Sequence, residues 1–130
     1  MEEKNVVRTE AAPAPFQGAP YSQGIVAGGF AFVPGQLALR PDHATIEATG
    51  VGEQTEQVFA NLRAILEAAG SGLEHVVKTT VYLQDLGDFA EMNEVYARHV
   101  GDKPPARATI EVAALPSGAL VEIEAVALVP

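Results

Sequence analysis

The chain has 130 residues, 48% of them hydrophobic, so it is long and apolar enough for one domain with a sizeable core, and a disordered tail is excluded. It contains no cysteine, which excludes a disulfide scaffold, a thiolate zinc site and a cysteine nucleophile, and which fits a cytoplasmic protein. The formal net charge of −9 argues against a nucleic-acid-binding surface and against binding to anionic membranes.

The N-terminal third predicts strands and turns. Residues 1–4 lack the basic and apolar stretches of a secretory signal. The range 11–39 has no charged residue, but four prolines and five glycines interrupt it, whereas a membrane-spanning helix needs about 20 mostly apolar residues without such breaks. A short strand is expected at 6–7, and two apolar runs in 25–33, separated by two glycines, are typical of a β-hairpin. We expect the Pro34-Gly35 pair to interrupt its second strand.

Two amphipathic helices are predicted further along the chain. Residues 52–69 place apolar side chains along one stripe at helical spacing, and Gly70 is suited to end this helix. For the second helix, Asp88 is a candidate N-cap, and Glu91 three residues later completes the pattern of a capping box. The apolar face of the second helix consists of Phe89, Met92, Tyr96 and Val100.

The ranges 76–83, 107–112 and 120–129 predict three more strands. The element order is therefore β-β-β-α-β-α-β-β, an α+β fold with one mixed sheet and two helices. Several strands are apolar on both faces, notably 25–33 and 125–129, whereas two helices packed on one face leave the other face open. Another copy of the chain is the simplest cover, so we expect a homo-oligomer.

The C-terminal strands offer the best candidates for chemistry. Strand alternation puts Arg107, Thr109 and Glu111 on one face, and it puts Glu122 and Glu124 on one face of the last strand. A fixed guanidinium can bind a carboxylate with two hydrogen bonds, and a nearby Glu can accept a proton from water. An exposed Arg–Glu pair between neighbouring strands is the alternative, and the spacing alone favours it. The three histidines lie far apart, and no metal site is predicted.

Short motifs occur in order along nearly the whole chain. They are Ala19-Pro20-Tyr21-Ser22-Gln23-Gly24, Pro34-Gly35-Gln36, NLRAILEAAG at 61–70, VKTTVYL at 77–83, DFAEMN at 88–93, Pro105-Ala106-Arg107 and VEIEA at 121–125. In this combination the chain resembles the RidA/YjgF family of reactive intermediate deaminases, also labelled endoribonuclease L-PSP-like.

The resemblance implies one domain of this family over residues 1–130, with a chorismate-mutase-like sheet and two helices packed on one face. It implies a homotrimer with a central β-barrel and with sites between subunits. The implied reaction is hydrolysis of 2-enamine and 2-imine acids, such as 2-aminoacrylate and 2-aminocrotonate, to 2-keto acids and ammonia. The family uses no cofactor for this reaction, although its substrates are released by pyridoxal-phosphate enzymes.

The resemblance also implies roles for individual residues. Arg107 would bind the substrate carboxylate, and Glu122 would orient and deprotonate the water that attacks the imine carbon. Tyr21 would donate or accept a hydrogen bond near the reacting group, unless it is an aromatic residue packed at a subunit interface. The implied lining of the substrate site consists of Gly35, Phe89, Asn93 and Thr109.

The lining residues also have structural interpretations. Phe89 is an ordinary core residue by type, Asn93 can bond locally, and Gly35 can be required only for its backbone angles. Pro34 stands where many members have Ser or Thr, and Thr109 stands where many have Cys. Two alternatives therefore remain beside the deaminase. One is RNA cleavage, which the net charge disfavours, and the other is a non-catalytic trimer that binds small carboxylates.

Overall fold

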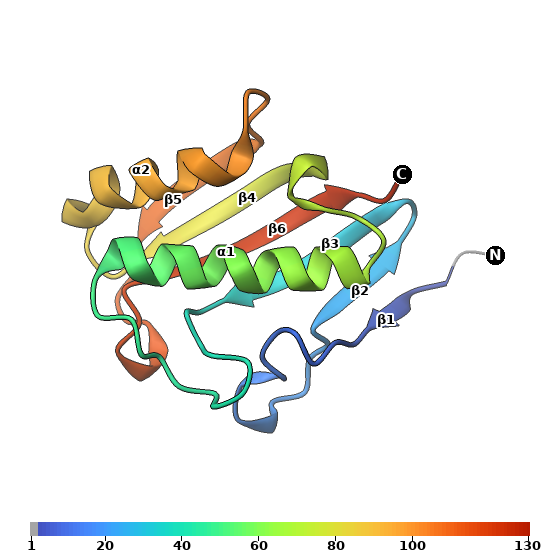
Figure 1. The fold of residues 1–130 in the computed structure, drawn as a ribbon, viewed down its shortest axis with the longest axis horizontal. Coiled ribbons are helices and arrows are strands. Elements are labelled where there is room, and N and C mark those ends of the chain that lie inside the picture. The colour runs from blue at the N-terminus through green and yellow to red at the C-terminus, as the bar shows by residue number, and fades with distance from the viewer. Residues whose placement is uncertain (1–2) are drawn as a thin grey trace.

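The computed structural model describes residues 3–130, so residues 1 and 2 of the expected domain lie outside the described residues. The strands and α-helices follow the predicted order: β1 (Asn5–Val7), β2 (Gly24–Ala27), β3 (Phe30–Gln36), α1 (Val51–Ala68), β4 (Val76–Leu83), α2 (Phe89–Val100), β5 (Ala106–Glu111) and β6 (Val121–Leu128). Short 3-10 helices lie at Phe16–Gly18, Leu73–His75, Leu86–Asp88 and Pro116–Gly118. The α+β prediction with one mixed sheet and two helices is confirmed (Figure 1).

The strands form one sheet in the order β1-β2-β3-β6-β4-β5. Neighbouring strands are antiparallel except for β4 and β5, which are parallel and are joined by the crossover helix α2. This topology places β6 at the centre of the sheet and β5 at one edge, beside α2 (Figure 1).

The predicted hairpin joins β2 to β3. Gly28 and Gly29 both have positive φ, at 58° and 82°, as a two-residue hairpin turn of type I′ requires. The expected interruption at Pro34-Gly35 is wrong, because β3 continues to Gln36. A register shift against β6 lies between Val33 and Gln36, so the proline sits at a bulge, where its missing N–H breaks no regular ladder.

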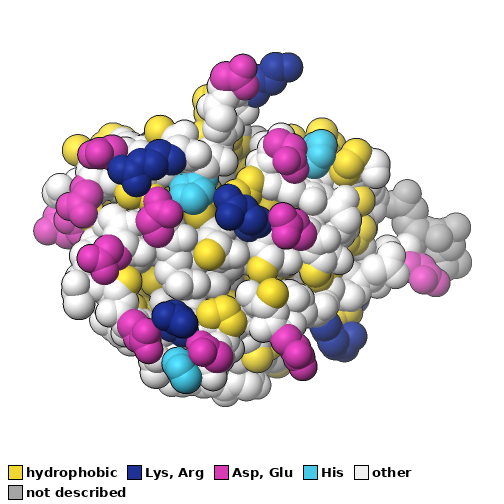
Figure 2. All heavy atoms as spheres, in the orientation of Figure 1, with side chains coloured by type: hydrophobic (Ala, Val, Ile, Leu, Met, Phe, Trp, Pro, Cys, Tyr) yellow, Lys and Arg dark blue, Asp and Glu magenta, His cyan; other side chains and the backbone are white. Residues whose placement is uncertain are grey.

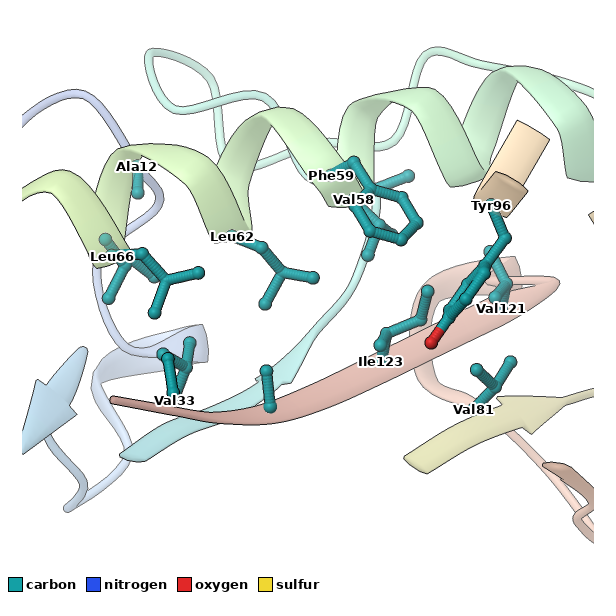
Figure 3. Close-up of a cluster of buried hydrophobic side chains, with 14 of the residues drawn as sticks. Ala12, Val33, Val58, Phe59, Leu62, Leu66, Val81, Tyr96, Val121 and Ile123 are labelled. Carbon is teal, nitrogen blue, oxygen red and sulfur yellow. The ribbon is translucent and has the colours of Figure 1, made fainter. Parts of the chain in front are cut away.

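Helix α1 packs on β3 and β6, and its apolar stripe forms the core with the inward-facing side chains of the strands (Figure 3). Val58, Leu62 and Ile65 of the predicted stripe are at most 1% exposed. Beyond the C-terminus of α1, Gly70 has a φ of 80°, and the N–H of Ser71 donates to the Leu66 carbonyl at 2.8 Å. This Schellman ending confirms the predicted stop at Gly70.

The start of α2 differs from the prediction. Asp88 is the N-cap, but its side chain makes no capping hydrogen bond, so the predicted capping box is wrong. Glu91 instead reaches across to α1, where its Oε2 accepts from the N–H of Gly52 at 3.1 Å. The carboxylate therefore satisfies a free N–H at the start of the neighbouring helix rather than of its own.

The two faces of the molecule differ in chemistry. Both helices cover one face of the sheet, and charged side chains of both signs are spread over that side (Figure 2). The opposite face is uncovered and carries exposed apolar side chains, among them Phe30, Phe32, Ile110 and Leu128. Cross-strand register pairs Phe30 with Leu128 and Phe32 with Val126, so these side chains form a continuous patch. No helix within residues 3–130 has the length and apolar character needed to cross a membrane.

Candidate active site

The sequence-predicted site residues lie in two clusters on opposite faces of the sheet. The Glu122 cluster consists of Tyr21, Pro34, Gly35 and Glu122. The Arg107 cluster consists of Phe89, Asn93, Tyr96, Arg107 and Thr109. Cross-strand register decides this division. Arg107 pairs with Thr79 of β4, whose hydroxyl bonds Tyr96 of α2, so Arg107 is on the helical face. Glu122 pairs with Tyr82 of β4. Tyr82 is next to the core residue Val81, so it and Glu122 are on the opposite face.

The Glu122 cluster lines a cleft of about 270 Å³ beside the bulge of β3. Glu122 comes from the central strand β6, and Pro34 and Gly35 come from the adjacent bulge. Tyr21 is contributed by the loop that precedes β2. A carboxylate, a tyrosine and a glycine backbone thus meet at one wall of the cleft.

Gly35 is required for space rather than for backbone angles. Its φ is not among the positive values, so the interpretation that its backbone angles alone demand glycine is wrong. A Cβ at this position would lie 2.8 Å from Cδ and 3.0 Å from Cγ of Glu122, closer than side-chain atoms normally approach. Any larger residue at position 35 therefore displaces the Glu122 carboxylate.

The surroundings of Glu122 favour its protonated form. Partial burial raises the pKa of this carboxyl, and the negative charge of Glu124 two residues along β6 raises it further. Glu124 is exposed and accepts a hydrogen bond from the Tyr82 hydroxyl at 2.6 Å. A carboxylate with a raised pKa is a stronger base than an ordinary glutamate, as proton abstraction from water requires.

Tyr21 is fixed by the loop around it. Its hydroxyl accepts from the N–H of Phe16, and the side chain remains 42% exposed. Sequence reasoning missed Gln23, which is buried and bonds the backbone of Thr9, Ala12 and Pro13. The available signal was that Gln23 lies in the uncharged range 11–39, which is expected to be buried. A buried amide needs hydrogen-bond partners, and the backbone of this loop supplies them. Gln23 shapes the cleft wall by holding this loop.

The Arg107 cluster lies on the helical face, at the edge of the sheet. The Cζ of Arg107 is 4.7 Å from the ring centroid of Tyr96 and 5.5 Å from that of Phe89. Together with Asn93 and the loop at 101–105, Arg107 lines a second cleft of about 360 Å³. This cleft therefore presents a cation beside the Tyr96 ring, and Phe89 lies near the same guanidinium.

Arg107 has no carboxylate partner within the described residues. The alternative of an Arg–Glu pair between neighbouring strands is therefore wrong for Arg107 and Glu122. Glu111, on the same face as Arg107, accepts from the N–H of Leu86 at 2.9 Å instead. The guanidinium thus keeps its hydrogen-bond donors free for an acidic ligand.

The remaining predicted residues complete the Arg107 cluster. Phe89 is 41% exposed, so the structure places it at the surface beside Arg107 and not in the core. Asn93 Oδ1 and Thr109 Oγ1 are buried atoms without a hydrogen-bond partner within the described residues. Such atoms are uncommon in folded proteins, and both of these belong to the cluster around Arg107.

The comparisons with known proteins agree with these motifs. The family model described as endoribonuclease L-PSP matches residues 9–129. The chain belongs to the RidA/YjgF family. A RutC family protein of Pyrococcus horikoshii is 51% identical to this RidA/YjgF member over 124 residues, which are 95% of this chain and 97% of that protein.

Two further relatives carry informative names. The human 2-iminobutanoate/2-iminopropanoate deaminase is 40% identical over 125 residues, which are 96% of this chain and 90% of the human protein. The crystal structure of RidA from an Antarctic Psychrobacter superposes with a TM-score of 0.90 at 43% identity, covering 95% of this chain and 98% of that one. The RidA/YjgF fold therefore extends over nearly the whole described chain.

Proposed function

We propose that this protein hydrolyses reactive 2-enamine and 2-imine acids to 2-keto acids and ammonia in the cytoplasm. The observation that carries the proposal is that one RidA/YjgF chain contains both a free Arg107 beside two aromatic rings and a partly buried Glu122 whose pKa is raised. The name of the human relative supports the same reaction class.

The site we propose is built from two copies of the chain. Arg107 and Glu122 lie on opposite faces of one sheet, so a single chain does not bring them to one substrate. The apolar patch on the open face supplies a surface for a second copy, next to the Glu122 cluster. We propose a homotrimer in which the open faces form a central β-barrel and each Glu122 cluster meets the Arg107 cluster of a neighbour.

The proposed chemistry requires little beyond positioning. Arg107 binds the carboxylate of the imino acid with two parallel hydrogen bonds, a contact worth about 1.5–3 kcal/mol. Glu122 takes a proton from a water molecule as the water oxygen bonds to the imine carbon and the C=N electron pair moves to nitrogen. Glu122 returns this proton to the nitrogen, which gives a carbinolamine. The proton of the new hydroxyl group then passes to the nitrogen by way of Glu122, the C–N bond breaks, and ammonia leaves as the keto group forms. Holding water and substrate together supplies most of the rate gain.

The decisive experiment is a coupled assay. A threonine dehydratase generates 2-aminocrotonate in place, and the appearance of 2-ketobutyrate is followed with and without this protein. We expect faster formation of the keto acid with the wild type, no acceleration with Arg107→Ala, and retained binding of 2-ketobutyrate but lost rate with Glu122→Gln. Wild-type turnover by Arg107→Ala contradicts the carboxylate role, and binding of 2-ketobutyrate without any turnover by the wild type indicates the non-catalytic alternative.

Mixing the two variants tests the shared site. When Arg107→Ala and Glu122→Gln chains are unfolded and reassembled together, some neighbours contribute an intact Arg107 and an intact Glu122. In an equal mixture, half of the chains carry an intact Arg107 and the other half an intact Glu122. Random assembly therefore gives about a quarter of the sites both groups, and we expect about a quarter of the wild-type rate. The control is a mixture of Arg107→Ala with the Arg107→Ala/Glu122→Gln double variant, which we expect to stay inactive. An inactive first mixture, with assembly shown by sedimentation, contradicts a site between copies.

A further inference from the structure

Arg107 must be both unpaired and immobile to select a small acid. An unpaired arginine side chain is long and flexible, and a carboxylate neighbour that fixed it would occupy its donors and neutralise its charge. An aromatic face avoids this conflict, because it attracts the guanidinium through the ring while the N–H groups at the guanidinium edge stay free. Tyr96 offers such a face, 4.7 Å from the Arg107 Cζ.

Tyr96 is itself held on every side. It is 5% exposed, and Figure 3 shows its side chain directed from α2 toward the sheet. Its hydroxyl and that of the buried Thr79 on β4 are 2.6 Å apart. On the helix side its ring meets Phe59 of α1 edge to face, with centroids 5.4 Å apart at 80°. The ring therefore has one orientation, fixed by both helices and by the strand next to Arg107.

We propose that Tyr96 is the positioning residue of the carboxylate site, presenting a rigid aromatic face that fixes the Arg107 guanidinium with its donors free. The inference rests on the proposed function in that the acid is the substrate carboxylate. Phe89 is exposed and flanks the same guanidinium at 5.5 Å, so Tyr96 forms the fixed inner wall and Phe89 the outer one. Tyr96 acts through Arg107 and touches no reacting atom.

The first test asks whether substitutions at Tyr96 weaken the binding of an acid more than they slow turnover. Tyr96→Leu removes the aromatic face, and we expect a roughly tenfold weaker Kd for 2-ketobutyrate by calorimetry and a similar rise in KM, with kcat changed far less. Tyr96→Phe keeps the face and restores the affinity to within about threefold. The matched control is Val95→Ala, which removes a buried side chain from the same helix and leaves the Tyr96 ring and its partners in place. Equal losses of affinity in Tyr96→Leu and Val95→Ala overturn the proposal.

A second test keeps the fold unchanged. Phenylalanine with one, two or three ring fluorines at position 96 weakens the attraction for a cation in steps at nearly constant shape. We expect the Kd for 2-ketobutyrate to rise with each added fluorine, and a flat series overturns the proposal. Both tests read binding, so they remain valid if the wild type binds 2-ketobutyrate without deaminating imines. Failure of the wild type to bind 2-ketobutyrate at all overturns the inference together with the carboxylate role of Arg107.

Discussion

Glu122 and Arg107 are kept reactive by different surroundings. Glu122 is partly buried beside a second carboxylate, and both conditions disfavour its charged form. Arg107 lies against two aromatic rings, with no anion in contact within residues 3–130. Glu122 is therefore disposed to accept a proton, and Arg107 is free to bind an anion. In the proposed reaction, water supplies the proton and the imino acid supplies the carboxylate.

The charge of Glu124 gives a pH prediction. Since Glu124 raises the pKa of Glu122, Glu124→Gln lowers that pKa, and Glu122 stays ionised to lower pH. We expect the acid limb of the kcat/KM profile to move to lower pH. On the alkaline side Glu122 is ionised in both proteins, so kcat/KM there should not change. The control is Glu111→Gln, the same change of charge on the opposite face. An unmoved limb, or one displaced to higher pH, contradicts Glu122 as the base.

At this scale the sequence supplied candidate residues for the site but not their arrangement. The motifs identified Arg107, Glu122 and Tyr21, and strand alternation placed Arg107 and Glu122 each on a face of its own strand. Alternation cannot relate the faces of two strands, because their register is set by pairings distant in the sequence. Tyr96 was assigned only to an apolar helix face, since its neighbour Thr79 is 17 residues away along the chain.

Helices α1 and α2 are linked by a carboxylate at the start of α1. Glu91 of α2 accepts from the N–H of Gly52, and a Cβ at Gly52 would lie 2.9 Å from the Glu91 Oε2. The sequence placed Glu91 in a local capping box because the spacing from Asp88 fits that motif. The structure has the longer-range cap because the N-cap of α1 is Gly50, which has no side chain to accept from the free N–H groups of the helix.

Removal of this contact should weaken the helix pair. We expect Glu91→Ala to lower the free energy of unfolding by about 1 kcal/mol, as for the loss of an N-cap. Urea unfolding followed by circular dichroism measures the change. Glu94→Ala is the control, because Glu94 lies on the same helix and pairs with exposed Arg98 at 3.5 Å. Equal effects of the two substitutions would show that the link to α1 contributes nothing.

Strand β3 shows where local signals mislead. Pro34 and Gly35 favour a break in the strand. The strand continues because the N–H that proline lacks would lie at a bulge, and β3 pairs with β6 on both sides of that bulge. The hairpin at Gly28-Gly29 was predictable, since its turn depends only on two adjacent residues. The bulge depends on the partner strand, which lies some 90 residues further along the chain.

The molecule as a whole has one charged, helical side and one apolar sheet side. The sequence predicted apolar residues on both faces of the sheet, because β3 and β6 carry large apolar side chains at both odd-numbered and even-numbered positions. The structure places Phe30 and Phe32 on the open face, 37% and 45% exposed, which is where a second copy was predicted to bind. The number of copies stays a prediction.

A charge placed on this face should prevent assembly. We expect Phe32→Lys to convert the proposed trimer to monomers in sedimentation velocity at micromolar concentration, because a lysine would be buried unpaired between copies. Ala60→Lys, on the exposed outer surface of α1, is the control and should assemble as the wild type does. A wild type that sediments as a monomer refutes the oligomer, and a Phe32→Lys trimer refutes this face as the interface.

If the proposed site is shared between copies, the back-to-back placement of Arg107 and Glu122 makes its activity depend on protein concentration. No side-chain rotation carries either group through the sheet, so an isolated chain holds two separate halves of the proposed site. We therefore expect the specific activity to fall steeply on dilution below the assembly constant, although the circular dichroism spectrum stays constant. In the proposed trimer, every chain that leaves removes its guanidinium from one site and its carboxylate from another.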